Sequence, residues 1–305
     1  MRSSILVLAG SMVALAGAPA YADVLGIQNN AAFGNGPIVT VDLTTQTIIN
    51  SFIPQQAGIG TNNGRGVEVL GNFVYYTELT NGFGPSSGIY VAPFNGGAGG
   101  ADIKSFANPV PGTGIVDLAA ANGELYAMTG YNLGPEVVQA TDGNGTNIGG
   151  PITLTNTNGS NLASSDGFTV LPNGNFLINT GDAINSYNQY NPITGAEIAG
   201  TTIQAIGPGG TACGSSTGVD NNSSTALGTD LVFDCNFNSL VVDTFNGTSL
   251  SFVSQTLTGT SGGEDISLVQ AGPITPPSVP EPASLALLGT GVALLGLVTR
   301  RRARG

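Results

Sequence analysis

Residues 166–180, DGFTVLPNGNFLINT, decide the predicted fold of this chain. Two short apolar runs, 168–171 and 176–178, lie on either side of the turn tripeptide Pro172-Asn173-Gly174. An Asn-Gly pair between apolar runs is a strong hairpin signal, because Asn and Gly tolerate the positive φ angles that tight turns need. The stretch therefore predicts two antiparallel strands joined by a short turn.

The same hairpin pattern recurs at a regular spacing. One unit opens at Gly66 and turns at Gly71-Asn72, a second opens at Gly114 and turns at Asn122-Gly123, and a weaker one opens at Gly218. With Gly167 included, the opening glycines are 48, 53 and 51 residues apart. Internal repetition at such a period is typical of architectures built from one repeated supersecondary unit.

Two further strand-like pieces follow the hairpin in each unit, and in the third unit they are residues 183–190 and 197–203. The chain contains 47 glycines, and no segment between residues 23 and 272 has a convincing helical periodicity. Four strands in a repeat of about 50 residues are typical of one blade of a β-propeller. We therefore predict an all-β fold.

The two ends of the repeat region complement each other. The N-terminal pieces 23–27, 37–43 and 47–53 look like the second, third and fourth strands of a blade, and residues 263–269 look like the missing first strand. Their pairing would close a ring of five four-stranded blades and remove the exposed sheet edges. The rival folds are a six-bladed propeller with one irregular blade and a pair of β-sandwiches.

The C-terminal residues 279–305, VPEPASLALLGTGVALLGLVTRRRARG, have a different composition. Pro280, Glu281 and Pro282 precede an uncharged apolar run of 17 residues, 283–299, and Arg300, Arg301 and Arg302 follow it. As a helix this run would span roughly 25 Å, near the lower limit for crossing a membrane. Because positive residues stay on the cytoplasmic side, the arginines would lie inside the cell and the rest of the chain outside.

This order of motif, apolar helix and arginine cluster resembles the PEP-CTERM sorting signal of bacterial exoproteins. The resemblance implies that a membrane-embedded exosortase recognises and processes the C-terminal end. It also implies export, transient anchoring in the inner membrane, and a final location at the cell surface or outside the cell. The alternative is a plain C-terminal membrane anchor.

The N-terminus predicts the same export route. Arg2 is followed by an apolar run, 5–17, and by Ala20-Tyr21-Ala22, which fits the small-x-small pattern of signal-peptide cleavage. The alternative is an uncleaved N-terminal anchor. The expected domains are a signal peptide at 1–22, a propeller at 23–271, a Pro-rich linker at 272–278 and the sorting signal at 279–305.

Removal of both ends would leave a strongly acidic domain. Two basic residues, Arg65 and Lys104, would remain against 18 acidic ones, which gives a formal charge of −16. Such a domain repels nucleic acid, so we expect no nucleic-acid partner. The charge is explained either by solubility outside the cell or by cation binding.

Few catalytic arrangements fit the composition. The chain has no histidine, which excludes histidine-based triads and histidine metal sites, and it has no tryptophan. No Gly-x-Ser-x-Gly motif is present, and we predict no catalytic residue. Cys213 and Cys235 are the only cysteines, and in an exported protein a pair predicts a disulfide.

Acidic residues offer the one candidate metal site. Glu68, Asp117, Asp166 and Asp265 occupy similar places near the first strands of their units, and those strands would line the central channel. Converging carboxylates there would need calcium or shared protons. The alternative is that they cap turns at the surface of the ring. No other cofactor is expected.

A second calcium candidate is the segment DGNGTN, residues 142–147, which alternates oxygen-bearing side chains with glycine. It lacks the closing acidic residue of an EF-hand loop, and the alternative is an ordinary Asx turn. The sequence favours a non-enzymatic binding or structural protein of the cell surface or extracellular matrix, with polysaccharide as a partner. The alternative is a calcium-dependent propeller enzyme of lactonase or lyase type.

Overall fold

The chain divides into two compact units, residues 1–271 and 272–305. The computed structural model describes residues 23–29, 35–43, 45–52, 62–80, 84–86, 88–95, 98–99, 102–130, 133–163, 165–181, 186–214, 216, 218–220, 230–236, 239–257 and 263–268. All of them lie in the first unit. The predicted signal peptide at 1–22, the linker at 272–278 and the predicted membrane helix at 283–299 lie outside the described residues.

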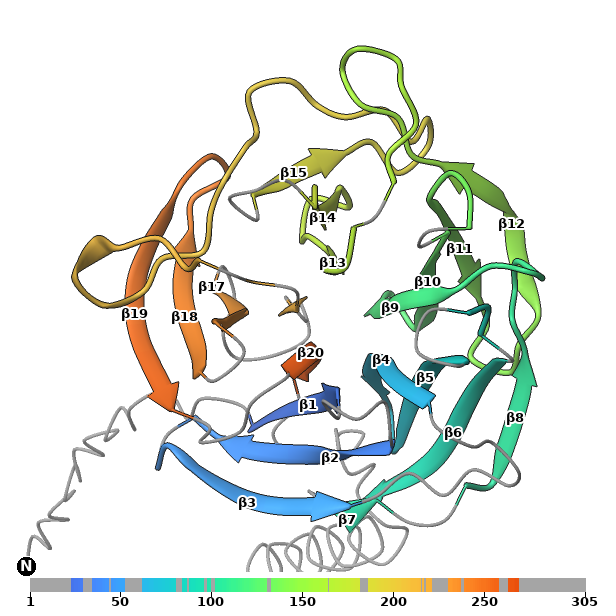
Figure 1. The fold of residues 1–305 in the computed structure, drawn as a ribbon, viewed down its shortest axis with the longest axis horizontal. Coiled ribbons are helices and arrows are strands. Elements are labelled where there is room, and N and C mark those ends of the chain that lie inside the picture. The colour runs from blue at the N-terminus through green and yellow to red at the C-terminus, as the bar shows by residue number, and fades with distance from the viewer. Residues whose placement is uncertain are drawn as a thin grey trace, which may run out of the picture. The chain divides into compact units, whose positions relative to one another are not determined.

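The described strands form antiparallel sheets that follow one another around a ring (Figure 1). The first sheet has the order β20 (Gly263–Leu268), β1 (Asp23–Asn29), β2 (Asn35–Asp42) and β3 (Thr47–Phe52). The second contains β4 (Asn62–Leu70), β5 (Phe73–Thr80), β6 (Gly88–Asn95), β7 (Ala98–Gly99) and β8 (Lys104–Ala107). In it, both β7 and β8 pair with β6.

The third sheet consists of β9 (Ile115–Ala121), β10 (Glu124–Thr129), β11 (Val137–Thr141) and β12 (Asn147–Thr153). The fourth consists of β13 (Phe168–Val170), β14 (Phe176–Asn179) and β15 (Tyr187–Tyr190). The fifth consists of β16 (Val219–Asp220), β17 (Asp230–Cys235), β18 (Ser239–Phe245) and β19 (Leu250–Leu257). We call β20, β4, β9, β13 and β16 the inner strands, because they lie nearest the centre of the ring (Figure 1).

The pairing of the chain's first and last strands is confirmed. β20 pairs antiparallel with β1, so that Leu268 lies opposite Val24 and Asp265 opposite Ile27. The last described strand therefore supplies the inner strand of the first sheet. An all-β, propeller-like ring closed by its two ends follows from this pairing.

The expected strand count is wrong for the fourth sheet. Among the sheets that the described residues form, four have at least four strands, and the fourth sheet has only three. The structure thus has four complete blades rather than five. The expected outer strand at 197–203 contributes only the isolated bridges Tyr190↔Glu197 and Tyr187↔Ile203. Between these bridges the chain turns at Gly200, whose φ is +78°, and a regular strand cannot continue through such a turn.

The predicted Asn-Gly hairpin of the third sheet has the expected geometry. Asn122 and Gly123 join β9 to β10 with φ angles of 54° and 81°. Left-handed backbone at both positions matches the twist of the flanking strands, and it explains why Gly is used there.

The apolar core consists of clusters between neighbouring sheets. In β9, Ile115 and Leu118 belong to a cluster shared with the second sheet, whereas Val116 and Ala119 belong to one shared with the fourth sheet. Because strand side chains point to opposite faces, an inner strand can pack against both neighbouring sheets. β9 is therefore buried on both faces over residues 115–119.

Secondary structure other than strands is sparse in the described part of the chain. One 3-10 turn, η1 (Pro208–Gly210), lies between the fourth and fifth sheets. Within those same residues, no helix is long and apolar enough to cross a membrane.

Candidate functional site

The inner strands carry a set of buried polar side chains. They contact one another in the order β20, β4, β9, β13 and β16, and β16 contacts β20 again. Besides Arg65 on β4, which is 4% exposed, their buried polar residues among the described side chains are each at most 3% exposed, and they are Glu68, Asp117, Thr169, Asp220 and Ser267. We call these five residues the inner belt.

The inner belt joins the first sheet to the second through Glu68. Ser267 Oγ, on β20, donates a hydrogen bond of 2.8 Å to Glu68 Oε1. The same carboxylate oxygen accepts the Val69 backbone N–H at 2.8 Å, and that N–H lies 2.9 Å from Ser267 Oγ. The carboxylate is thus held by donors from both strands.

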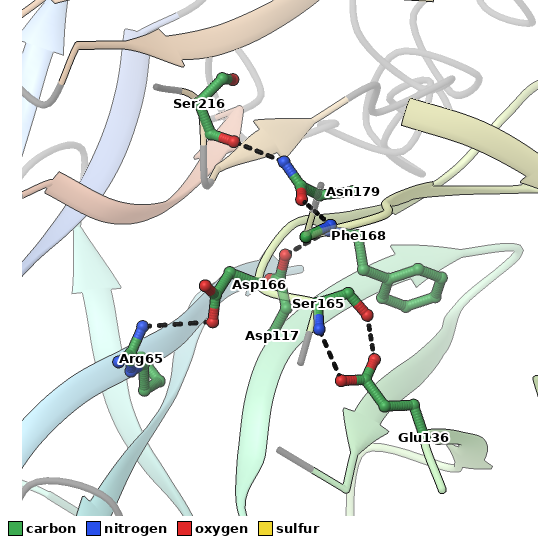
Figure 2. Close-up of polar contacts among 9 residues, drawn as sticks. Arg65, Asp117, Glu136, Ser165, Asp166, Phe168, Asn179 and Ser216 are labelled. Carbon is green, nitrogen blue, oxygen red and sulfur yellow. Dashed lines mark hydrogen bonds and ion pairs between the residues drawn. The ribbon is translucent and has the colours of Figure 1, made fainter. Parts of the chain in front are cut away.

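Asp117 connects the third sheet to the fourth in a similar way. Its Oδ1 accepts the Leu118 N–H at 2.6 Å, and its Oδ2 accepts the Phe168 N–H from β13 (Figure 2). One strand further round the ring, Thr169 Oγ1 donates to Asp220 Oδ1 at 3.0 Å. The belt residues therefore link consecutive inner strands.

An ion pair links two sheets that are not neighbours. Arg65, on β4, lies 3.4 Å from Asp166 Oδ1, just before β13 (Figure 2). The Arg65 side chain is 5% exposed and that of Asp166 is 22% exposed, so the pair is largely shielded from solvent. Asp166 therefore differs from the belt carboxylates, with which the sequence grouped it.

The segments that lead into the inner strands are attached to the preceding sheet. Both oxygens of Glu136, which is fully buried, accept hydrogen bonds from Ser165: one from its N–H at 2.7 Å and the other from its Oγ–H (Figure 2). We call each contact region between neighbouring sheets a joint. At the joint between the fourth and fifth sheets, Asn179 Nδ2 donates to the Ser216 carbonyl at 2.6 Å. At the joint between the second and third sheets, Ser86 Oγ accepts the Ile115 N–H at 2.8 Å.

Sequence reasoning missed these joints, although the repeat contains a signal for two of them. Ser165 stands two residues before the opening Gly167, and Ser216 stands two residues before Gly218. A buried hydroxyl residue at the same place in two repeats indicates a repeated contact. Glu136 has no such signal.

The predicted metal ligands do not form one cluster among the described side chains. No group of three or more Asp, Glu or Cys side chains in the described part of the chain could hold a metal ion. The side chain of Asp265 lies outside the described ones, so the full set with Glu68, Asp117 and Asp166 stays a prediction. The oxygens of Glu68 and Asp117 accept hydrogen bonds between inner strands, and both residues are buried within β4 and β9 rather than capping turns at the ring surface.

The segment 142–147 is an Asx turn. Hydrogen bonds from the backbone N–H groups of Thr146 and Asn144 to Asp142 Oδ1 hold the pKa of this carboxyl below its usual range. Lys104 Nζ donates to Asn144 Oδ1 at 2.8 Å and to the Gly143 carbonyl at 3.2 Å. An ammonium group thus binds the oxygens that a calcium ion would need, and the structure favours the Asx alternative.

The predicted disulfide is confirmed. Cys213 and Cys235 are bonded, and each is 2% exposed. Cys213 lies in the segment between the fourth and fifth sheets, and Cys235 ends β17. The bond therefore attaches the connecting segment to the fifth sheet.

A further buried carboxyl, Asp243, has an environment unlike that of the belt. It lies on β18, and its Oδ2 accepts the Ile206 N–H at 2.8 Å, while its Oδ1 has no hydrogen-bond partner among the described atoms. Burial raises the pKa of Asp243 to about 6; the Ile206 hydrogen bond works against this rise, and the negative charge of Asp230 adds to it. No sequence pattern singled out this residue.

The C-terminal residues match a known protein-sorting motif. Residues 278–302 match the family model of the PEP-CTERM protein-sorting motif. The chain carries a PEP-CTERM motif. The matched range includes Pro280, Glu281, Pro282 and the three arginines 300–302. A PEP-CTERM motif indicates an exported protein that an exosortase, a membrane enzyme, sorts.

No curated protein sequence matches the chain. Among similar solved structures is a protein of unknown function from Bacteroides caccae, with a TM-score of 0.41, 11% identity, and coverage of 77% of this chain and 72% of that one. A protein from Lactobacillus plantarum has a TM-score of 0.46, 12% identity, and coverage of 82% and 99%. Glutaminyl cyclase from Myxococcus xanthus has a TM-score of 0.40, 13% identity, and coverage of 76% and 92%. Because these identities and TM-scores are low, the activities of these proteins say nothing about the activity of this chain.

Proposed function

We propose that this protein is a non-enzymatic binding or structural component of the bacterial cell surface or extracellular matrix. The PEP-CTERM motif at 278–302 is the observation that carries the proposal. In this proposal the signal peptide 1–22 directs export, and the apolar run 283–299 holds the chain in the inner membrane until an exosortase acts. The linker 272–278 then separates the propeller domain, 23–271, from the processed end.

The use of the inner carboxylates supports a structural rather than a catalytic role. At least seven of the 18 acidic residues in the mature region are buried, namely Glu68, Glu78, Asp117, Glu136, Asp220, Asp234 and Asp243. Solubility therefore does not explain the whole of the negative charge. Glu68, Asp117 and Glu136 hold neighbouring sheets together. A calcium-dependent enzyme would instead need carboxylates that converge on a metal, and thermal stabilisation by calcium would favour that alternative.

We propose extracellular polysaccharide as the partner class. Exposed turn tips carry uncharged amides and hydroxyls, for example at Asn158, Asn173 and Thr194. Such groups donate and accept hydrogen bonds with sugar hydroxyls without introducing a charge. The proposal concerns the class of ligand and assigns no particular binding residue.

Mass spectrometry of the protein recovered from its own host tests the sorting proposal. We expect a mature N-terminus at Asp23 and loss of residues 283–305, with the protein outside the inner membrane. A variant with Pro280→Ala, Glu281→Ala and Pro282→Ala should keep its C-terminal residues and remain in the membrane fraction.

The matched control carries Pro276→Ala and Pro277→Ala in the linker and should be processed like the natural chain. An intact C-terminus on the natural protein in its host would refute sorting. Processing of the Pro280–Pro282 variant at the normal efficiency would show that the motif is not what the membrane enzyme recognises.

A further inference from the structure

The joint between the fourth and fifth sheets contains a carboxyl inside an apolar cluster. Asp243 is fully buried on β18. Two residues earlier on that strand, Val241 belongs to a cluster with Tyr187 of the fourth sheet and Phe233 of the fifth. Ile206 packs against the same cluster. Successive odd positions of a strand share one face, so Asp243 faces the same joint as Val241.

The segment 203–214, which we call the connecting segment, is attached at its ends, where Ile203 exchanges two backbone hydrogen bonds with Tyr187 and the Gly214 N–H donates to Asn236 Oδ1 at 3.0 Å, and at two described points between them. Cys213 is bonded to Cys235 on β17, and the Ile206 N–H donates to Asp243 Oδ2 at 2.8 Å. One attachment is covalent, and the other depends on a carboxyl. The second oxygen of that carboxyl, Oδ1, is buried without a hydrogen-bond partner among the described atoms.

No basic side chain is available to neutralise Asp243. Arg65 and Lys104 are the only basic residues between the predicted processing sites. Arg65 pairs with Asp166, and Lys104 donates to Asn144. Burying an ionised carboxylate without a partner charge is expensive, and such groups usually become neutral by holding a proton.

The groups around Asp243 favour the same outcome. Asp230, on β17, adds a second negative charge, while its Oδ1 accepts a hydrogen bond from Thr244. The connecting segment and β19 contain no charged residue, and the strands of the fourth sheet contribute only the phenol of Tyr187 and that of Tyr190. Every charged neighbour is thus negative.

We propose that Asp243 is a proton-operated latch that holds the connecting segment against β18. With a proton, the carboxyl is neutral and accepts the Ile206 N–H without an electrostatic cost. When the proton leaves, a buried negative charge remains that the single Ile206 N–H and no cation stabilises, and the connecting segment loosens to let water reach it. The disulfide keeps the segment attached in both states.

The pH range of the latch follows from the two pKa values. Burial raises the pKa of Asp243 to about 6 in the folded protein, whereas an unfolded aspartate has a pKa of about 3.9. Because the folded state binds the proton more tightly, this group opposes folding increasingly as the pH rises from about 4 to about 6. The destabilisation of the folded state by Asp243 is absent below about pH 4 and complete above about pH 6.

Hydrogen exchange of the full chain in detergent, followed by mass spectrometry, tests the proposal. After correction for the intrinsic exchange rate, the protection of amides in 203–214 should fall roughly tenfold between pH 5 and pH 7. Asp243→Asn keeps an oxygen for the Ile206 N–H but cannot ionise, and its protection should change less than twofold over the same range. Asp142→Asn, at an exposed carboxyl, should respond like the natural chain.

Equal pH responses in the natural chain and Asp243→Asn would overturn the latch. If that variant does not fold, a carbon-13 titration of aspartate carboxyls in the natural chain decides the question. A carboxyl assigned to Asp243 that titrates near pH 6 supports the proposal, and one that titrates below about 4.5 refutes it.

Discussion

Asp117 and Asp243 are both fully buried aspartates at joints between neighbouring sheets, yet their environments differ. Both oxygens of Asp117 accept backbone N–H groups, from Leu118 and from Phe168. Asp243 accepts one such N–H at Oδ2, and its Oδ1 has no hydrogen-bond partner among the described atoms. The difference teaches that a domain with almost no basic residues stabilises buried carboxyls either by backbone donors or by a proton.

The largest expected effect is at the first of these joints. Asp117→Ala would leave the buried N–H groups of Leu118 and Phe168 without their acceptor. An unsatisfied buried donor costs about 1–3 kcal/mol, so we expect a loss of roughly 4 kcal/mol in the free energy of unfolding. Urea denaturation of the full chain at pH 7.5 measures this.

Isosteric amide variants sharpen the comparison. Asp117→Asn keeps one acceptor and loses the charge that two donors stabilise, so it should destabilise the protein at pH 7.5. Asp243→Asn removes an uncompensated charge and should stabilise it or leave it unchanged. Effects of the same sign at both positions would contradict the distinction between the two joints.

The ring itself was predictable because its signals are local and repeated. Asn-Gly turns fix hairpins within ten residues, and the chain's start in the middle of a unit pointed to β20 as the partner of β1. The outer strand of the fourth sheet was predicted wrongly. Its sequence, EIAGTTI, contains β-branched residues typical of a strand, but Gly200 turns the chain between Glu197 and Ile203.

The inner belt was only partly predictable. Counting from the opening glycines places Glu68, Thr169 and Asp220 at the same position, two residues after Gly in each unit. Asp166 precedes its glycine, and it forms an ion pair instead. The prediction grouped acids that lie near the first strands without aligning them to the opening glycines, and so it included Asp166 and omitted Thr169 and Asp220.

Asp243 illustrates what local pattern cannot supply. Its only described donor, Ile206, lies 37 residues earlier, in a segment without regular strands. Its environment arises when two sheets and a disulfide-bonded segment pack together. Only the scarcity of basic residues could have warned that buried acids would need protons or backbone donors.

A third prediction concerns the covalent attachment between the connecting segment and the fifth sheet. The Cys213→Ala, Cys235→Ala double variant should lose about 3 kcal/mol, because the bond closes a loop of 22 residues in the unfolded chain. The connecting segment would then lose its covalent attachment and keep only its hydrogen bonds, among them the one from Ile206 to Asp243. Its loss of hydrogen-exchange protection between pH 5 and pH 7 should therefore exceed that of the natural chain.

Reduction of the natural disulfide with a phosphine in urea provides an independent measurement. It should move the unfolding midpoint by the same amount as the double variant. An unchanged midpoint in both experiments would mean that packing in the joint, rather than the disulfide, limits unfolding.

The smallest effect is expected where a turn of the third sheet meets the second sheet. Lys104→Met keeps most of the apolar stem but removes the donor to Asn144 Oδ1, and it should cost about 0.5–1 kcal/mol, since the contact is exposed. A double-mutant cycle with Asn144→Ala isolates the direct interaction. Because the acceptor is a neutral amide, the coupling should persist in 0.5 M salt. A coupling that vanishes with salt would instead show that Lys104 acts through the carboxylate of Asp142, and the turn would then be held by charge, unlike the joint at Asp117.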